Sequence, residues 1–322
     1  MTACPWVEII FDSPSASEAW KAIFRQLRNL TLAGMTPTEL HNQTVAADRL
    51  LAESAWELWM AYQREAPRTS KALRQWWSEP TPFGRAVLIL DAFSLRQLVP
   101  LLKGAQARGL LPTAVRVTGS EVPSDTDQFA GALGVLARHK LVNNGAPATF
   151  AFRDELVFTD VLRMPFEDSM ASVPAVRNVF IWHTWLDDLI HVHKKSPEQI
   201  VKAASDVLQD DGFWGFVDRL RQGRKLVITA DHGYAESRLF SSEETEPDVV
   251  EALRETFGAS RYRVASEPWL ARFMPPIVLT ENDFHVVMGQ RKWKVQGGFP
   301  HLIHGGLSLL EVAVPFVEFP PL

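Results

Sequence analysis

The sequence has few of the features that mark secreted or membrane-spanning proteins. Cys4 is the only cysteine among the 322 residues, so no disulfide can form within the chain. No apolar run reaches the roughly 18 residues that a membrane-spanning helix needs. The first twelve residues, MTACPWVEIIFD, lack the basic segment and apolar core of a signal peptide. We therefore expect a cytoplasmic protein without a membrane partner.

The charge balance also lacks a basic excess. Lys and Arg together number 33 and Asp and Glu 38, which gives a formal net charge of −5. A protein that coats nucleic acid needs a strong excess of basic residues, so that class is excluded, although a local basic groove is compatible with the balance. Hydrophobic residues make up 46% of the chain, enough for a large core and for one or two domains.

Helical periodicity dominates residues 1–80, which we predict to be an N-terminal helical region. Apolar residues within 20–27 fall on one helix face, and a second such stripe covers about 45–65. Trp76 and Trp77 end this region, and large aromatic side chains of this kind are expected to pack in a core.

Residues 81–322 show strand-like runs that alternate with helical stretches. The runs AVLIL, TAVRV, VFIW and LVIT are each followed by polar residues. Strands that alternate with helices predict a mainly parallel sheet covered on both faces, which is an α/β fold. We expect the less regular segment 236–300 to be a cap insertion. Closing strands are expected near His285 and at 314–319.

Polar residues at the carboxyl ends of parallel strands are the first site candidates, because functional groups gather there. Asp91 follows AVLIL, and Asp231 and His232 follow KLVITA. A buried carboxylate needs a partner, and neighbouring oxygen and nitrogen ligands suit a metal ion. Gly233 lets the chain turn sharply after them. Taken alone, Asp91 could equally cap the next helix, and Asp-His-Gly could be a simple turn.

Two more pieces of the chain offer histidine ligands. Asp187 and His191 are four residues apart, so on a helix their side chains share one face and could bind one metal. Asp188 competes for this role through its spacing of three residues. His304 precedes two glycines near the end of the chain, and His301 is a nearby alternative.

The loop VPSDTDQ follows the strand TAVRV and could expose a hydroxyl group. Thr126 is the candidate, with Ser124 and Thr118 as neighbouring alternatives. By itself the loop is also typical of an ordinary helix start.

The order of these pieces resembles that of the alkaline-phosphatase superfamily. An Asp at a strand end, P-S-x-T, D-x-x-x-H, D-H-G and a late H-G-G follow one another along the chain. The runs HTWLDDLIH, LVITADHGY and HGGLSLLEVAVP especially resemble the PglZ domain of BREX-type phage-defence operons and of some response-regulator outputs. The resemblance covers about residues 84–319 and implies an alkaline-phosphatase-like fold of three layers, αβα.

The resemblance also implies two divalent metal ions, zinc or manganese, and a threonine nucleophile. The first ion would be held by Asp91, Thr126, Asp231 and His232. The second would be held by Asp187, His191 and His304. Carboxylate oxygens with imidazole nitrogens suit these metals, two such ions can clamp a phosphate, and coordination activates the hydroxyl of Thr126.

The chain departs from the family at the groups that bind phosphate. Relatives have Arg or Asn shortly after the nucleophile, where this chain has Asp127 and Gln128. Relatives of the PglZ kind have Arg close behind the first Asp, whereas Arg96 lies five residues on. Gln128 and Arg96 are therefore the candidates for substrate binding.

We expect a phosphodiesterase that acts on nucleotides or short nucleic acids, because the extra acid at Asp127 disfavours highly charged monoesters. One alternative is a phosphomonoesterase or phosphomutase on the same site. The other is a non-catalytic scaffold of a defence complex, bound to other proteins of that system.

Overall fold

The computed structural model describes residues 5–153, 156–192, 197–240, 242–243, 246–269, 271–296, 298 and 302–322, without the side chains of 191, 192, 197, 242 and 243. Within these residues, every helix is too short or too polar to cross a lipid bilayer.

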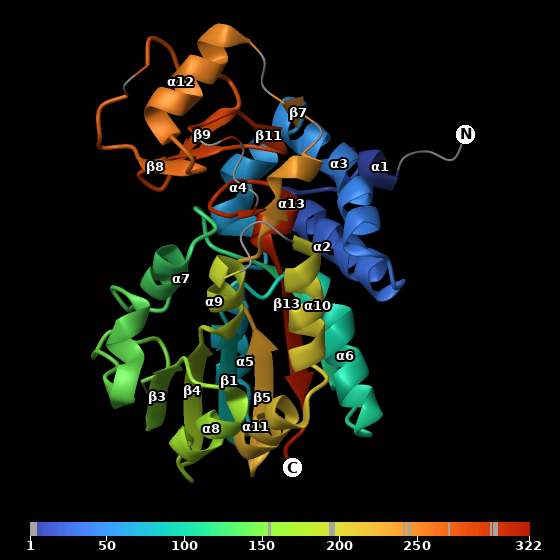
Figure 1. The fold of residues 1–322 in the computed structure, drawn as a ribbon, viewed down its shortest axis with the longest axis vertical. Coiled ribbons are helices and arrows are strands. Elements are labelled where there is room, and N and C mark those ends of the chain that lie inside the picture. The colour runs from blue at the N-terminus through green and yellow to red at the C-terminus, as the bar shows by residue number, and fades with distance from the viewer. Residues whose placement is uncertain are drawn as a thin grey trace.

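A mainly parallel sheet forms the centre of the described chain, with the strand order β2-β13-β5-β1-β4-β3 (Figure 1). Its strands are β1 (Gly84–Leu90), β2 (Ala114–Gly119), β3 (Val157–Leu162), β4 (Asn178–His183), β5 (Arg224–Thr229) and β13 (Ala313–Phe319). Parallel pairing joins β1 to β4 and β5, and β3 to β4, whereas β13 is antiparallel to β2 and β5. The expected α/β class is confirmed.

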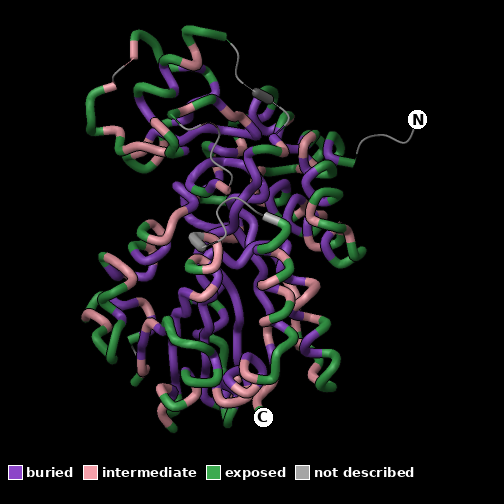
Figure 2. The backbone as a smooth tube through the Cα atoms, in the orientation of Figure 1, coloured by how far each residue is buried: buried purple, intermediate pink, exposed green. Residues whose placement is uncertain are grey.

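Alternate residues of each strand pack on opposite faces of the sheet. In β1, Ala86 and Leu88 belong to one buried cluster, and Val87 and Ile89 belong to another. Because both faces are covered, β1 is buried along its whole length and apolar from Ala86 to Leu90, and Figure 2 shows the middle of the sheet buried. The first face is covered by α6 (Leu98–Ala107), α8 (Phe166–Ser169), α9 (Trp185–Val192), α10 (Pro197–Val207) and α11 (Asp211–Arg221). The second is covered by α5 (Thr69–Ser78) and α7 (Thr126–Ala132).

Helices also fill the N-terminal region of the described chain. They are α1 (Pro5–Phe11), α2 (Ala16–Leu32), α3 (Pro37–Glu53) and α4 (Glu57–Glu65), followed by α5. Trp20 of α2 packs on Trp59 of α4 with ring centroids 4.8 Å apart. The stripe expected over 45–65 is not continuous, because α3 ends before Ser54 and α4 begins at Glu57.

The N-terminal helices share a core with the end of the chain. Their buried cluster includes Leu309 and Val312, from the short helix α13 (Leu309–Val312) that precedes β13. Trp76 and Trp77 of α5 are buried under the sheet, as expected. A domain boundary near residue 80 stays a prediction, since this core crosses it.

The chain between β5 and α13 forms a smaller unit. Its larger elements are α12 (Pro247–Phe257), β8 (Tyr262–Val264), β9 (Val278–Glu281) and β10 (Phe284–Val287). Its shorter strands are β6 (Ala235–Glu236), β7 (Ser242–Glu243), β11 (Arg291–Lys292) and β12 (Leu302–Ile303). The strand expected near His285 is β10, which pairs with β8 and β9 in a separate antiparallel sheet, so its expected place in the main sheet was wrong.

This smaller unit lies beyond the carboxyl ends of the parallel strands. Figure 1 shows α12, β8 and β9 at the end of the molecule opposite the C terminus. Since β13 runs antiparallel to β5, the C terminus marks the amino ends of the parallel strands. Any site at their carboxyl ends therefore faces the smaller unit.

Candidate functional site

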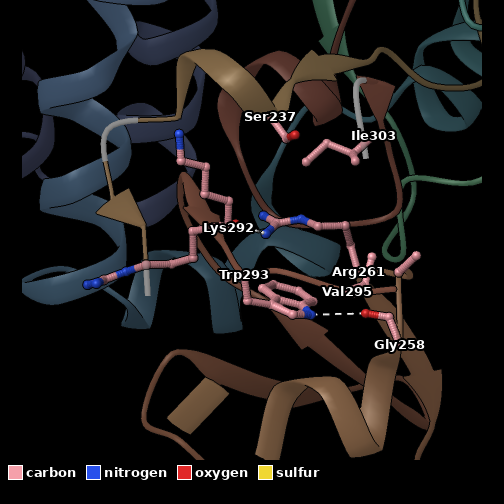
Figure 3. Close-up of a pocket in the computed structure, with 9 residues that line it drawn as sticks. Ser237, Gly258, Arg261, Lys292, Trp293, Val295 and Ile303 are labelled. Carbon is pink, nitrogen blue, oxygen red and sulfur yellow. Dashed lines mark hydrogen bonds between the residues drawn. The ribbon is translucent and has the colours of Figure 1, made fainter. Parts of the chain in front are cut away.

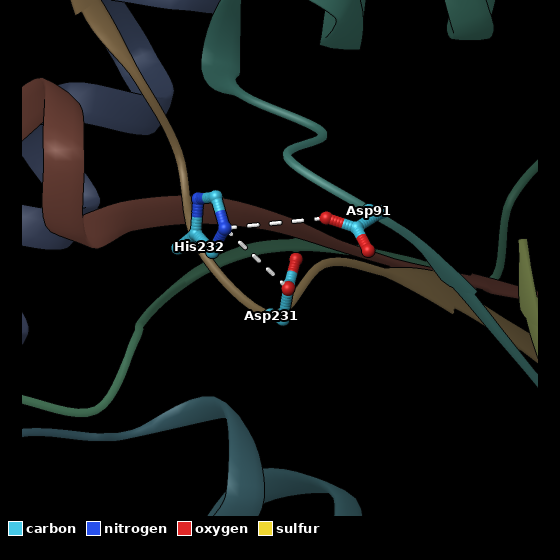
Figure 4. A group of neighbouring side chains, drawn as sticks. All are labelled: Asp91, Asp231 and His232. Atoms are coloured by element: carbon cyan, nitrogen blue, oxygen red, sulfur yellow. Dashed lines mark ion pairs between the residues drawn. The ribbon is translucent and has the colours of Figure 1, made fainter. Parts of the chain in front are cut away.

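A cluster of Asp91, Asp231 and His232 lies at the carboxyl end of the sheet (Figure 4). Asp91 directly follows β1, and Asp231 follows β5 after one residue, and these two strands are hydrogen-bonded neighbours. Each residue offers one ligand atom, and the three atoms lie within 4.8 Å of one another. All three residues are buried. The pairing of two sheet strands thus brings together groups that are 140 residues apart in sequence.

One oxygen of the Asp91 carboxylate has hydrogen-bonding and ionic partners, and the other has no hydrogen-bond partner among the described residues. Oδ2 accepts a hydrogen bond from Trp182 Nε1 at 3.1 Å and forms an ion pair with Arg138. Oδ1 is buried without a hydrogen-bond partner in the described chain and lies 4.0 Å from His232 Nε2. A buried carboxylate oxygen without a donor is costly. A cation between Oδ1 and His232 would satisfy it, so the orphaned oxygen fits a metal site.

Asp231 is oriented by the turn that follows β1. Ala92 has a φ of 59°, and its backbone N–H donates to Asp231 Oδ1 at 3.0 Å. A left-handed conformation is uncommon for a residue other than glycine and costs backbone energy. This backbone contact orients one carboxylate oxygen and leaves Oδ2 directed at Thr126.

Thr126 is the first residue of α7, and its hydroxyl points into the cluster. Oγ1 donates to Asp231 Oδ2 at 2.6 Å and lies 3.4 Å from His232 Nε2. The alternative hydroxyls are occupied elsewhere: Ser124 bonds to the backbone of residues 305 and 306, and Thr118 pairs with Thr69. Among these three hydroxyls, that of Thr126 is adjacent to the acidic cluster.

His304 approaches the cluster from the other side of His232. The two imidazole rings stack with centroids 4.4 Å apart and planes 16° from parallel. His304 Nδ1 lies 3.7 Å from an oxygen of Asp125, the residue that caps α7. Partial burial and the nearby His232 lower the pKa of His304, which favours the neutral imidazole that binds metals. His301, the competing histidine, lies outside the described residues.

A latch holds the loop of His304 against the loop of Thr126. The hydroxyl of Ser124 accepts from Gly305 N at 2.9 Å and donates to Gly306 O at 3.0 Å. Gly306 N donates to Glu311 Oε1 at 2.9 Å. Gly305 has a φ of 93°, and a Cβ there would lie 2.6 Å from the ring of Tyr262. Glycine is therefore required at this position both for conformation and for space.

Asp187 and Asp188 differ in their surroundings. Asp187 is half-buried, and its charge contributes to raising the pKa of His232. Asp188 is exposed and accepts a hydrogen bond from Thr184 Oγ1 at 2.6 Å. His191 belongs to α9, but its side chain lies outside the described part of the structure, so its part in a second metal site stays a prediction.

The two expected phosphate-binding residues are placed differently. Gln128 is half-buried in the first turn of α7. Arg96 has a buried side chain that donates to Tyr234 O at 2.8 Å and stacks on the Tyr234 ring. Its guanidinium also lies 4.0 Å from Glu236. These contacts give Arg96 a clear packing role.

Electrostatics in the cluster favour bound cations. Burial acts to lower the pKa of His232, but the charges of Asp231 and then Asp125 outweigh it and raise the pKa above its ordinary value. His232 Nδ1 lies 2.9 Å from Gly233 O. If Nδ1 carries the proton, Nε2 is left to bind a metal, which is the usual arrangement for a histidine ligand.

Sequence reasoning missed Arg138, Trp182 and Asp125. Arg138 begins a short 3₁₀ segment, η2 (Arg138–Asn144), and reaches Asp91 across the site. Trp182 lies inside β4, where an apolar run conceals its indole donor. Asp125 resembles an ordinary helix cap, which it also is. No local motif distinguishes any of these residues.

A small hollow lies around Arg261 and is lined mainly by residues of the 236–300 segment (Figure 3). It holds only about 10 Å³, which is enough for about one water molecule. The guanidinium of Arg261 is buried and forms an ion pair with Glu311 at 3.2 Å. Trp293 Nε1 donates to Gly258 O at 2.9 Å on the same side. The hollow is too small for a substrate, and Arg261 supports the glycine loop through Glu311.

Comparison with known proteins gives one family and one curated relative. The model of the BREX system PglZ alkaline phosphatase-like domain matches residues 139–319. The alkaline phosphatase-like protein PglZ of Bacillus cereus (strain H3081.97) is 28% identical over 152 residues. That match covers 44% of this chain and 17% of the Bacillus protein, so the chain corresponds to a small part of that relative.

Two solved structures show more distant likeness. Phosphonoacetate hydrolase from Sinorhizobium meliloti 1021, in complex with phosphonoacetate, has a TM-score of 0.43 at 15% identity, over 74% of this chain and 90% of that chain. Human ectonucleotide pyrophosphatase/phosphodiesterase 5 has a TM-score of 0.44 at 12% identity, over 74% and 88%. Likeness at this level says nothing about activity.

Proposed function

The chain belongs to the family of BREX system PglZ alkaline phosphatase-like domains, and on that premise we propose that it is a metal-dependent phosphoesterase with Thr126 as nucleophile. One observation carries the proposal. The hydroxyl of Thr126 lies 2.6 Å from Asp231 Oδ2 and 3.4 Å from His232 Nε2, beside the orphaned oxygen of Asp91. A hydroxyl, two carboxylates and an imidazole around one point form a ligand set that suits zinc or manganese.

In the proposed site, two divalent ions would be held by residues of this chain. The first set is Asp91, Thr126, Asp231 and His232. The second set is Asp187, His191 and His304. Ions bound there would supply positive charge that lowers the pKa of the threonine hydroxyl and neutralises phosphate oxygens.

The remaining chemistry belongs to the side chains. The proton of Thr126 Oγ1 is directed to Asp231, which prepares the oxygen to attack. Attack forms a bond from Oγ1 to phosphorus and breaks the bond to one ester oxygen, which takes a proton from solvent and departs as an alcohol, so phospho-Thr126 keeps the other ester group of the substrate. A water molecule then hydrolyses this ester and restores the hydroxyl. Trp182 and Arg138 act as positioning residues, because they fix the oxygen of Asp91 that does not face the centre.

The acidic surroundings of Thr126 support a diester as the substrate. Asp125 and Asp127 flank the nucleophile, and burial together with the charge of Asp125 raises the pKa of Asp127. Negative charge at this loop repels a doubly charged monoester more than a singly charged diester. We therefore propose phosphodiesters of nucleotides or short nucleic acids as substrates.

Replacement of Thr126 by alanine tests the nucleophile. We expect Thr126→Ala to lower turnover of an aryl phosphodiester by about a thousandfold or more, with the metal content measured by mass spectrometry unchanged at about two ions per chain. Thr149→Ala removes an exposed hydroxyl bonded to Gly134 O and is the matched control. Near-normal turnover in Thr126→Ala would overturn the assignment.

A substrate panel tests the reaction class. Linear dinucleotides, aryl diesters and aryl monoesters are compared with zinc or manganese added. Faster turnover of diesters supports the proposal, and faster turnover of monoesters supports a phosphatase. Bound metal without turnover of any ester would support a scaffold instead.

The proposed biological setting is a cytoplasmic phage-defence assembly that contains protein partners. The family description names the BREX system and supports the defence part of this proposal. The efficiency of phage plating on cells that carry the Thr126→Ala allele tests whether catalysis contributes to defence. A plating efficiency equal to that on wild-type cells would contradict a catalytic role in defence.

A further inference from the structure

A groove lined by basic side chains lies between α2, α5 and the edge strand β2. Its volume is about 400 Å³. Eleven residues line it, among them Phe24 and the cations Lys21, Arg25, Arg28, Lys71 and Arg116. Five of them are lysines or arginines and none is an acid, in a chain whose net charge is −5. The overall composition therefore does not account for this concentration of positive charge.

Most of this charge is not neutralised. Lys21, Arg25 and Arg28 follow one another at spacings of four and three residues, so they share one face of α2. Lys21 forms an ion pair with Glu18 at 2.8 Å. Arg25 and Arg28 form no ion pair with any described residue, and Arg28 donates only to the neutral amide of an adjacent asparagine.

The opposite wall adds two more cations. Lys71 of α5 donates to two backbone carbonyls and feels the charge of Glu65, but it forms no ion pair at contact distance within the described chain. Arg116 of β2 forms an ion pair with Glu318 at 2.6 Å. Three of the five cations, namely Arg25, Arg28 and Lys71, thus have no carboxylate at contact distance in the described chain and can still attract anions. A concave site lined by one sign of charge concentrates ligands of the opposite sign.

The surfaces between the cations are small and mostly apolar. Phe24 is buried at 2% exposure, so its ring is largely unavailable for stacking on a base. Proteins that hold the bases of a single strand do so by stacking them on exposed aromatic faces. The groove offers charge instead, and its volume suits one strand rather than a duplex.

We propose that this groove binds the phosphodiester backbone of single-stranded nucleic acid, independently of base sequence. The groove is not part of the metal centre, and binding there requires no metal. It is nevertheless connected to the centre through the chain, because β2 runs on from Thr118 into the loop that ends at Thr126. The hydrogen bond from Tyr62 Oη of α4 to Ser120 O, at 3.0 Å, holds the start of that loop against the N-terminal helices.

The test measures binding of a fluorescent oligothymidine of about 20 nucleotides to the full chain by anisotropy. Chelator is present throughout, so that failure of the proposed catalysis cannot affect the result. The variant is Arg25→Gln, Arg28→Gln and Lys71→Gln combined. Each lost phosphate contact should make the salt dependence shallower by about 0.7 in log Kd against log salt. We expect a slope shallower by about 2 and affinity about tenfold weaker at moderate salt.

The control variant removes the same charge elsewhere. Arg49→Gln, Lys202→Gln and Arg254→Gln lie on α3, α10 and α12, and all three side chains are exposed. We expect this control to bind like the wild type, and thermal melting should find all three proteins folded.

Three outcomes would overturn the proposal. The first is equal affinity and salt slope for the wild type and the groove variant. The second is a duplex of the same length that binds as tightly as the single strand. The third is stronger binding to vesicles of anionic lipid than to DNA, with the same dependence on the groove residues, which would assign the groove to a membrane surface.

Discussion

Asparagine in place of Asp48 should remove a large pH dependence from the stability of this protein. Asp48 lies in α3 and is buried at 1% exposure. Its Oδ1 accepts from Leu309 N at 2.7 Å, and its Oδ2 accepts from Gln290 Nε2 at 2.8 Å. Burial, assisted by the charge of Glu311, raises the pKa of Asp48 from 3.8 to about 7.

The sign follows from the direction of this shift. The folded state binds the proton more tightly than the unfolded state, so the stabilising effect is complete below about pH 4. It is lost as the pH rises through about 7, where the folded carboxyl ionises. A shift from 3.8 to about 7 corresponds to a loss of roughly 2.5 kcal/mol in the free energy of unfolding between about pH 5 and about pH 8.

The asparagine variant keeps the geometry without the ionisation. Its side-chain oxygen can accept from Leu309 N as Asp48 does. Its amide can donate to Gln290 Oε1 after rotation of the glutamine amide, and that oxygen is buried without a partner among the described residues. The advantage of Asp48→Asn over the wild type in the free energy of unfolding should therefore grow by roughly 2.5 kcal/mol between about pH 5 and about pH 8.

Urea denaturation at the two pH values measures this effect. The quantity compared is the difference in the free energy of unfolding between wild type and variant, in which the contributions of the other titrating groups cancel. Asp12→Asn, at an exposed position after α1, is the matched control and should follow the wild type. Parallel stability profiles for wild type and Asp48→Asn would refute the reasoning, because they would mean that Asp48 is no harder to ionise in the folded protein.

Two further predictions concern the site. Ser124→Ala removes the latch to Gly305 and Gly306 and leaves two buried backbone groups unsatisfied. The free energy of unfolding measured by urea denaturation should therefore fall by about 2–3 kcal/mol. Unchanged stability would contradict the latch. Arg138→Met leaves the buried Asp91 without its cation and should destabilise the metal-free protein by about 2 kcal/mol. Added zinc should reverse most of that loss of stability, as measured by thermal melting. Arg138→Lys should lose less stability than Arg138→Met. An equal loss with and without zinc would contradict the role of Arg138 as the cation that neutralises Asp91.

The amino-acid sequence by itself determined the class of fold and selected the acidic residues of the candidate site. The apolar run of β1 is a local signal, because a strand buried on both faces must be apolar throughout. Asp91 and Asp231 could be selected because polar residues that follow such runs come to the same edge of a parallel sheet. The ordered motifs then indicated the family, which the family model confirms over residues 139–319.

Only the tertiary structure decided which side chains meet. Strand order made β1 and β5 neighbours, and nothing within either strand specifies that pairing. Arg138 reaches Asp91 from a segment without a motif, and Arg96 is directed into packing although it lies near Asp91 in sequence. The physical reason is that strand pairing and side-chain packing depend on contacts between distant residues, whereas periodicity and motif spacing report only local geometry.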